Sequence, residues 1–229
     1  MIILKDKFTR ILRNFLIILF LCQLFLISSS FADVSSQCKH VARELIGGTR
    51  GPSDYNNPLN RKHIIIVEKF HFTPQVEQLI KGSTDTHPPH DLNYTLKHFP
   101  NHHRALYSVI RYDLANRKPK LDKSAECYLT LALTFKPRDA TVWMLFGLYY
   151  QRKLEFEKSL EKYQRSEKIN PDNAQLHYNL GLLFLKKEDY KHALKHARKA
   201  YKLGIKLPGL KRKLIKAGKW NDKKLIKAI

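Results

Sequence analysis

Apolar and small residues recur with a spacing of 34 positions over residues 140–207. In the first segment, residues 140–173, the recurring positions hold Trp143, Phe146, Gly147, Tyr150, Ser159, Tyr163, Ser166 and Pro171. In the second, residues 174–207, they hold His177, Leu180, Gly181, Phe184, Ala193, Ala197, Ala200 and Ile205, of which Ala197 and Ile205 depart from the pattern. A repeat of this length is typical of helix pairs that stack along the chain. The pattern therefore predicts two helices in each segment.

Small residues mark the places where paired helices come close together. We expect Gly147 and Gly181 on the first helices to face small residues on the second, Ser159 and Ala193. Glycine has no side chain to hold two backbones apart, so it suits a close approach. Pro171 follows the first helix pair and ends it, because proline cannot continue the hydrogen-bond ladder of a helix.

A weaker version of the pattern precedes these two segments, over residues 91–139. A first helix over about 102–115 keeps apolar residues in register, and Pro137 occupies the stop position. The turn over residues 116–122 is longer than in the later repeats, and Pro100 indicates a further helix starting at about Asp91. We therefore expect one or two divergent helical repeats here.

The flanking segments are expected to differ from the repeats. Residues 33–90 form an N-terminal arm that is irregular to about Pro58, with one helix over 61–70 and a second that starts at Thr73-Pro74 and ends by Gly82. Residues 82–90 look like an exposed loop. At the other end, residues 208–229 predict a basic helix that caps the array, with Leu210, Leu214 and Ala217 on one stripe.

The spacing and residue types resemble those of the tetratricopeptide repeat (TPR). The sequence also resembles an exported, largely uncharacterised family of bacterial TPR proteins. That likeness rests on the strings at residues 71–74, 91–96 and 99–106 and on the ending Leu207-Pro208-Gly209-Leu210. The resemblance implies an all-α fold, an α-solenoid, in the bacterial envelope, and it implies no defined activity. The general TPR family implies binding of a protein or peptide in a concave groove.

The first 32 residues have the order of a secretory signal peptide. Four basic residues precede an apolar run, and small residues at Ser30 and Ala32 suit cleavage. The apolar run is shorter than the roughly 20 residues that span a bilayer. We therefore predict an exported, periplasmic protein. The alternative is an inner-membrane anchor formed by residues 15–28, with the rest of the chain facing the periplasm.

Charge and cysteine content add two expectations. The formal net charge is +22, or +19 once residues 1–32 and their Lys5, Lys7, Arg10, Arg13 and Asp6 are removed. This favours association with anionic lipid, glycan or protein surfaces, although lysine bias across a proteome would produce the same charge. Nucleic acid is not expected as the partner of an exported protein.

Two cysteines remain after residue 32. In an oxidising compartment Cys38 and Cys127 would form a disulfide, with two unpaired thiols as the alternative.

The candidate binding site is the groove lined by the first helix of each repeat. Its expected residues are His103, Leu106, Tyr107, Ile110, Met144, Leu148, Gln151, Arg152, Tyr178, Asn179, Leu182, Leu185 and Lys186. Aromatic, Met and Arg side chains are enriched at binding surfaces. Leucines at nominally exposed positions favour a protein partner, and the alternative is that the N-terminal arm covers them.

No catalytic, cofactor or metal site is expected. The sequence lacks a Gly-rich phosphate loop, a G-x-S-x-G elbow and an H-E-x-x-H motif. The histidines between His87 and His103 lie close in sequence but have no Cys or carboxylate at a recognised ligand spacing. We therefore expect a non-enzymatic adaptor that binds a protein, without a small-molecule substrate. The alternative is a surface binder that uses its basic C-terminal helix on anionic lipid or glycan.

Overall fold

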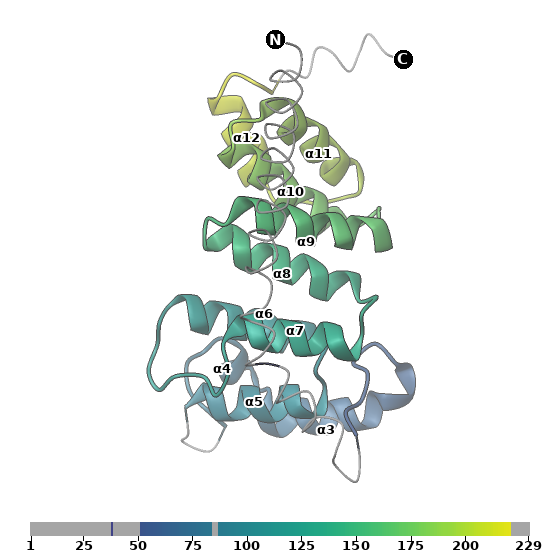
Figure 1. The fold of residues 1–229 in the computed structure, drawn as a ribbon, viewed down its shortest axis with the longest axis vertical. Coiled ribbons are helices and arrows are strands. Elements are labelled where there is room, and N and C mark those ends of the chain that lie inside the picture. Colours follow the sequence, from purple (N-terminus) through teal and green to yellow (C-terminus); the bar gives the residue numbers. More distant parts are fainter. Residues whose placement is uncertain (1–37, 39–50, 84–86, 221–229) are drawn as a thin grey trace, which may run out of the picture. The chain divides into compact units, whose positions relative to one another are not determined.

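The computed structural model describes Cys38, residues 51–83 and residues 87–220 (Figure 1). Apart from Cys38, which belongs to a unit of residues Met1–Glu44, all of them lie in one compact unit, Leu45–Ile229. Regular secondary structure in the described part is helical throughout. The predicted signal peptide, residues 33–37 and 39–50 of the predicted arm, and residues 221–229 fall outside the described residues.

The chain is an all-α helical array, as the repeat pattern predicts. A short 3₁₀ helix, η1 (Pro58–Asn60), precedes α3 (Arg61–His71), α4 (Pro74–Glu77), α5 (Pro88–His98) and α6 (His103–Leu114). These are followed by α7 (Ala125–Phe135), α8 (Ala140–Arg152), α9 (Phe156–Ile169), α10 (Ala174–Lys186), α11 (Tyr190–Lys202) and α12 (Gly209–Lys216). None of the helices in the described ranges is long and apolar enough to cross a bilayer.

Side-chain caps fix where several helices begin. The Ser124 side chain accepts a hydrogen bond from the backbone N–H of the third residue of α7, at 3.2 Å. Asn173 does the same for α10 at 3.0 Å, and Asp189 for α11 at 3.1 Å. Each cap satisfies an N–H that has no partner inside its own helix. The helix starts are therefore encoded locally in the sequence.

The paired helices of each repeat pack where small residues allow it. Helix α8 packs along α9, and α10 packs along α11. A β-carbon at Gly147 would lie 2.6 Å from Cε1 of Tyr163 on α9, well inside contact distance. A β-carbon at Gly181 would lie 3.4 Å from the backbone carbonyl oxygen of Ala193 on α11, and 2.5 Å from a methyl group of Leu210. The expectation that these glycines lie at close helix contacts is confirmed.

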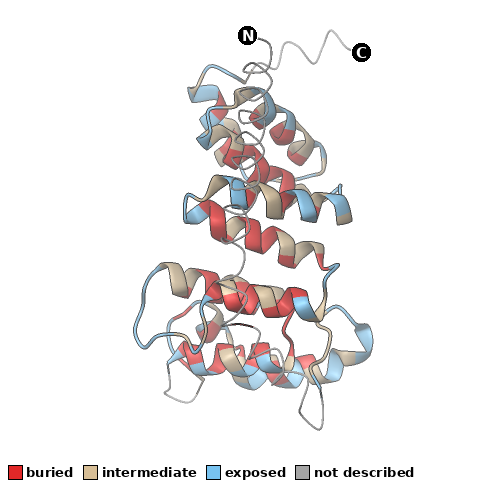
Figure 2. Cartoon of the chain, viewed as in Figure 1, coloured by how far each residue is buried: buried red, intermediate tan, exposed pale blue. Residues whose placement is uncertain are grey.

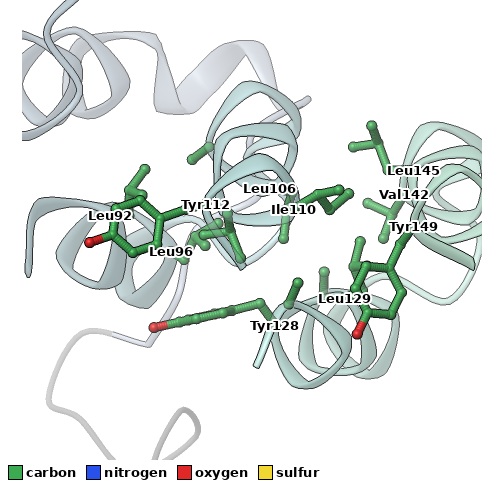
Figure 3. Close-up of a cluster of buried hydrophobic side chains, with 14 of the residues drawn as sticks. Leu92, Leu96, Leu106, Ile110, Tyr112, Tyr128, Leu129, Val142, Leu145 and Tyr149 are labelled. Carbon is green, nitrogen blue, oxygen red and sulfur yellow. The ribbon is translucent and has the colours of Figure 1, made fainter. Parts of the chain in front are cut away.

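The largest core lies between α4, α5, α6, α7 and α8. Figure 3 shows its side chains pointing toward one another from α5, α6, α7 and α8. Leu92, Leu106, Ile110, Leu129 and Val142 have no exposed surface. Buried residues run along most of α8, whereas α9 buries only Ser159, Tyr163 and Ser166 (Figure 2).

Helix α12 closes the C-terminal end of the described array. It packs against α10 and α11, and Leu210 and Leu214 are fully buried there. The backbone N–H of Leu210 donates to the Tyr178 hydroxyl at 3.2 Å. The basic residues Arg212, Lys213 and Lys216 are exposed. The predicted stripe of Leu210 and Leu214 therefore does cover the last helix pair.

The structure corrects the expected N-terminal part at the start of α5. Residues 88–90 are not part of an exposed loop: Pro88 and Pro89 are buried and begin the first turn of α5, where proline needs no N–H donor. Helix α5 therefore starts before the expected Asp91. The helix that starts at Pro74 ends at Glu77, and Leu79 just beyond it adopts a φ of 63°.

The expectation of a disulfide is confirmed. Cys38 and Cys127 are both disulfide-bonded and buried, and Cys127 lies in the first turn of α7.

Candidate functional site

Three of the helices supply the expected groove residues, and the structure divides these residues into distinct groups. On α6, Leu106 and Ile110 have no exposed surface and belong to the core. On α8, Met144 and Gln151 are also buried. Residues without exposed surface cannot contact a partner, so Leu106 and Ile110 stabilise the array.

A second group holds the array together through hydrogen bonds. Tyr163 of α9 donates its hydroxyl to Oε1 of Gln151 at 2.6 Å. Burial raises the pKa of Tyr163 far above its ordinary value, so the hydroxyl stays protonated. Gln175 donates to Oδ1 of Asn179 at 3.0 Å, within α10. Gln151 and Asn179 are thus engaged within the repeats.

The C-terminal groove residues are partly covered. The ring of Tyr178 is buried and its hydroxyl accepts a hydrogen bond from α12. Leu182 and Leu185 are half-buried and pack against the cluster that includes Leu210 and Leu214. Lys186 is exposed at the end of α10. Much of the predicted apolar surface of α10 is therefore used in packing with the last helices.

An aromatic ring flanked by two arginines remains accessible between α6 and α8. The Cζ atoms of Arg111 and Arg152 lie 5.3 and 5.6 Å from the centre of the Tyr107 ring. Arg152 also donates from Nη2 to the Tyr107 hydroxyl at 3.2 Å. Leu148 lies one helical turn before Arg152, so it shares that side of α8, and it is half-buried. We name Tyr107, Arg111, Leu148 and Arg152 the α6–α8 face.

Residues of the N-terminal arm cover one end of the same two helices. Tyr55 places its ring 5.4 Å from that of His103, edge to face. Asn56 donates to Oδ2 of Asp139 at 2.9 Å, and Asn101 donates to the same oxygen at 3.1 Å. His103 Nε2 lies 2.9 Å from this carboxylate. Of the predicted groove residues, His103 is thus occupied by the arm and by Asp139.

Asp139 is the centre of that junction. Its Oδ1 caps α8 by accepting from the N–H groups of Thr141 and Val142. Burial raises the pKa of Asp139, but the hydrogen bond and charge of His103 and the bond from Asn101 outweigh it. The carboxyl pKa therefore lies below its ordinary value, and Asp139 is a carboxylate at neutral pH.

A second buried polar cluster links α3, α4 and α6. His102, with no exposed surface, accepts at Nδ1 from the N–H of Ala105 and meets Glu68 Oε1 through Nε2 at 3.0 Å. Burial lowers the pKa of His102 below its ordinary value despite the hydrogen bond to Glu68. Arg104 pairs with Glu68 and Glu77. His102 and His103 thus engage different carboxylates.

An exposed apolar surface on α3 was not predicted from the sequence. Ile65, Ile66 and Phe70 are 51%, 57% and 55% exposed, and Ile80 nearby in sequence is 66% exposed. The signal was available, since residues 64–67 are all apolar while a helix in this position can bury only part of its circumference. Ile64 and Val67 take the buried positions.

Comparisons with known proteins agree with the repeat architecture. Residues 155–188 match the family model described as "TPR repeat". The match covers α9 and α10, the second helix of one pair and the first of the next. The matched segment begins and ends at other residues than the segments 140–173 and 174–207, and it has the same length as each of them. No curated protein sequence matches the chain.

Two solved structures are similar to the chain at low identity. They are "MamA RS-1 ArsTM double mutant" and "MamA 41-end from Desulfovibrio magneticus RS-1". Each is 19% identical with a TM-score of 0.41, covering 75% of this chain and 95% or 96% of the other. At those values neither structure bears on the function of this chain. The 34-residue repeat, the paired helices in contact at Gly147 and Gly181, and the matched segment together show tetratricopeptide-type helix pairs over residues 140–207.

Proposed function

We propose that this protein is an exported, non-catalytic adaptor that holds a segment of another protein against the α6–α8 face. The observation that carries the proposal is the Tyr107 ring flanked by Arg111 and Arg152, beside a half-buried Leu148. Tyr and Arg are the residue types that contribute most to binding at protein interfaces. Leu148 adds apolar area that a partner can cover.

The chemistry of the face favours a particular partner segment. A guanidinium group such as that of the exposed Arg152 can donate paired hydrogen bonds to a carboxylate, whereas Arg111 already donates to the backbone carbonyl oxygen of Glu77. The Tyr107 ring between the two arginines supplies flat apolar area. A segment with a carboxylate beside an apolar side chain fits this combination. The net charge of +19 that remains after cleavage of residues 1–32 would draw such a segment to the protein over longer distances.

The test compares one pair of substitutions on the face with a matched pair elsewhere. Leu148→Glu with Arg152→Glu removes one apolar and one basic side chain from the face. Leu154→Glu with Lys168→Glu makes the same changes at two exposed positions after α8 and on α9. Proteins captured by crosslinking in intact bacterial envelopes should be lost with the first pair and retained with the second. Equal capture by both variants would reject the α6–α8 face.

Export is tested on the protein recovered from cells. Cleavage after Ala32 predicts an N-terminus at Asp33 in the periplasmic fraction. Recovery of the uncleaved chain in the membrane fraction would favour the anchor alternative. The disulfide at Cys38 and Cys127 supports an oxidising compartment.

A second candidate function uses α12. Arg212, Lys213 and Lys216 are exposed beside Ile215, which is 53% exposed. A basic helix with an exposed apolar residue can bind anionic lipid. Sedimentation with vesicles of phosphatidylglycerol would show binding that weakens with salt. Absence of binding, or binding insensitive to salt, rejects this alternative.

A further inference from the structure

Two buried histidines meet at the junction of three helices. His177 on α10 and His196 on α11 place their Nδ1 atoms 3.0 Å apart. Glu167, near the end of α9, brings Oε1 to 3.8 Å from the same nitrogen of His177. One ligand atom from each residue lies within 4.8 Å of the other two. Two imidazoles and a carboxylate are a donor set that first-row transition metals take in proteins.

The second ring nitrogen of His177 determines which atom faces this junction. Nε2 lies 2.7 Å from the backbone carbonyl oxygen of Pro171. A carbonyl oxygen only accepts hydrogen bonds, so Nε2 carries the hydrogen and Nδ1 of the neutral ring holds a lone pair. A histidine that donates its other N–H to a backbone carbonyl is the usual arrangement of a metal-binding imidazole. His177 is therefore already oriented as a ligand.

The ring of His196 is held in place as well. It stacks on Phe184 with 5.5 Å between ring centres and an interplanar angle of 13°. His196 is also only 9% exposed, so the surrounding helices enclose it. A neutral imidazole is the form that binds metals.

We propose that Glu167, His177 and His196 bind one divalent transition-metal ion, with zinc as the best-fitting cation and water as the fourth ligand. Zinc–nitrogen bonds of about 2.0–2.1 Å place two nitrogens of a tetrahedral site about 3.4 Å apart. The 3.0 Å separation of the two Nδ1 atoms thus needs to open by only a few tenths of an ångström. His196 would bind as the tautomer with its hydrogen on Nε2.

The ligands come from three successive helices, and this gives the site a structural consequence. A metal held by α9, α10 and α11 would link the second helix of one repeat to both helices of the next. A ligand that binds the folded state alone stabilises it in proportion to the logarithm of its free concentration. We therefore expect zinc to raise the thermal midpoint of unfolding of these repeats.

The test uses the purified protein after removal of metals with a chelator. Zinc stoichiometry is measured by elemental analysis, and Co²⁺ absorption reports tetrahedral coordination. His196→Gln and Glu167→Gln remove ligands. His192→Gln is the matched control, because His192 lies on the same helix, is exposed and bonds Asp189 instead.

We expect one Zn²⁺ per wild-type chain, no stoichiometric binding by His196→Gln, and affinity about tenfold or more weaker for Glu167→Gln. The control should bind as the wild type does. Equal zinc affinity in the wild type and both ligand variants, or no stoichiometric zinc in the wild type, would overturn the proposal. If His196→Gln does not fold by circular dichroism, Glu167→Gln decides, because Glu167 is partly exposed.

Discussion

The Ser159 hydroxyl donates a 2.8 Å hydrogen bond to the backbone carbonyl oxygen of Gly147 on the neighbouring helix. Both residues are buried, and each occupies a small-residue position of the repeat. The bond shows why serine suits this position. A larger residue would separate α8 from α9, while alanine would leave the contact without its cross-helix bond. Small size and one polar atom thus act together at the closest approach of the pair.

The first prediction concerns the space at Gly147. Gly147→Val should lower the free energy of unfolding by about 1–3 kcal/mol, because the new side chain meets the fully buried Tyr163 ring. Gly181→Ala should lower the free energy of unfolding by a smaller amount, since its tightest contact is a Leu210 methyl group that can rotate away. Denaturant unfolding followed by circular dichroism measures both.

Gly51 supplies the control for this pair. A β-carbon there would meet nothing within 4 Å, so Gly51→Ala should leave stability unchanged within about 0.5 kcal/mol. A Gly147→Val protein as stable as the wild type would mean that α8 and α9 do not pack as described.

The second prediction concerns the buried hydrogen bond from Tyr163 to Gln151. Tyr163→Phe should destabilise by about 1–3 kcal/mol, because Oε1 of the buried glutamine loses its donor. Adding Gln151→Leu should recover part of that loss, since neither partner then remains unsatisfied. If the double variant loses more free energy of unfolding than the two single variants lose together, Gln151 has a different role.

Much of this array could be predicted because its determinants are local. Glycine at a close contact, a capping residue such as Asn173 and a stop at Pro171 each act within a few residues. Burial was harder to predict. Leu106 and Ile110 occupy positions that line the groove in regular repeats, yet α7 and α8 enclose them. Their surroundings depend on how a divergent repeat packs. The position of a residue within the repeat does not determine that packing.

Two further features could not be predicted from the repeat pattern. Leu154 and Glu188, 34 residues apart, both adopt positive φ at the turn between paired helices, although neither is the glycine or asparagine that signals such a turn. The contact of His177 with His196 was missed because the repeat pattern asks only for a large residue at the position of His177 and specifies no residue at the position of His196. Only the packing of α10 on α11 shows that they meet.

The third prediction concerns the C-terminal cap. Leu210→Ala should destabilise by about 2–5 kcal/mol, because the side chain is fully buried against α10 and α11. Hydrogen exchange should rise first in those two helices. Ile215→Ala on the same helix is the control and should change little, since Ile215 is 53% exposed. Similar exchange in both variants would argue against a capping role for α12.

The fourth prediction is a pH dependence from His102. Its folded pKa lies below the unfolded value near 6.5, so the unfolded chain takes up the proton first as pH falls. Stability is therefore full above about pH 6.5 and declines as pH falls below it. Glu68 and Arg104 are the charged groups beside the ring. His102→Asn, which keeps a capping side chain, should show a smaller decline between pH 7.5 and 5.

His87→Asn is the matched control for that experiment. His87 is exposed and its side chain makes no capping bond to α5, so the pH profile should match that of the wild type. If His102→Asn loses as much stability on acidification as the wild type, His102 does not account for the acid sensitivity.

The most direct measurement of the proposed function places a photo-crosslinking amino acid at single positions in cells that produce the protein. Position 148 lies on the α6–α8 face, position 154 lies beyond the end of α8, and position 66 lies on the exposed side of α3. The adaptor account predicts a discrete crosslinked protein from position 148 that is absent from position 154 and weakened by Arg152→Glu. A crosslink from position 66 alone, or none from position 148, would contradict it.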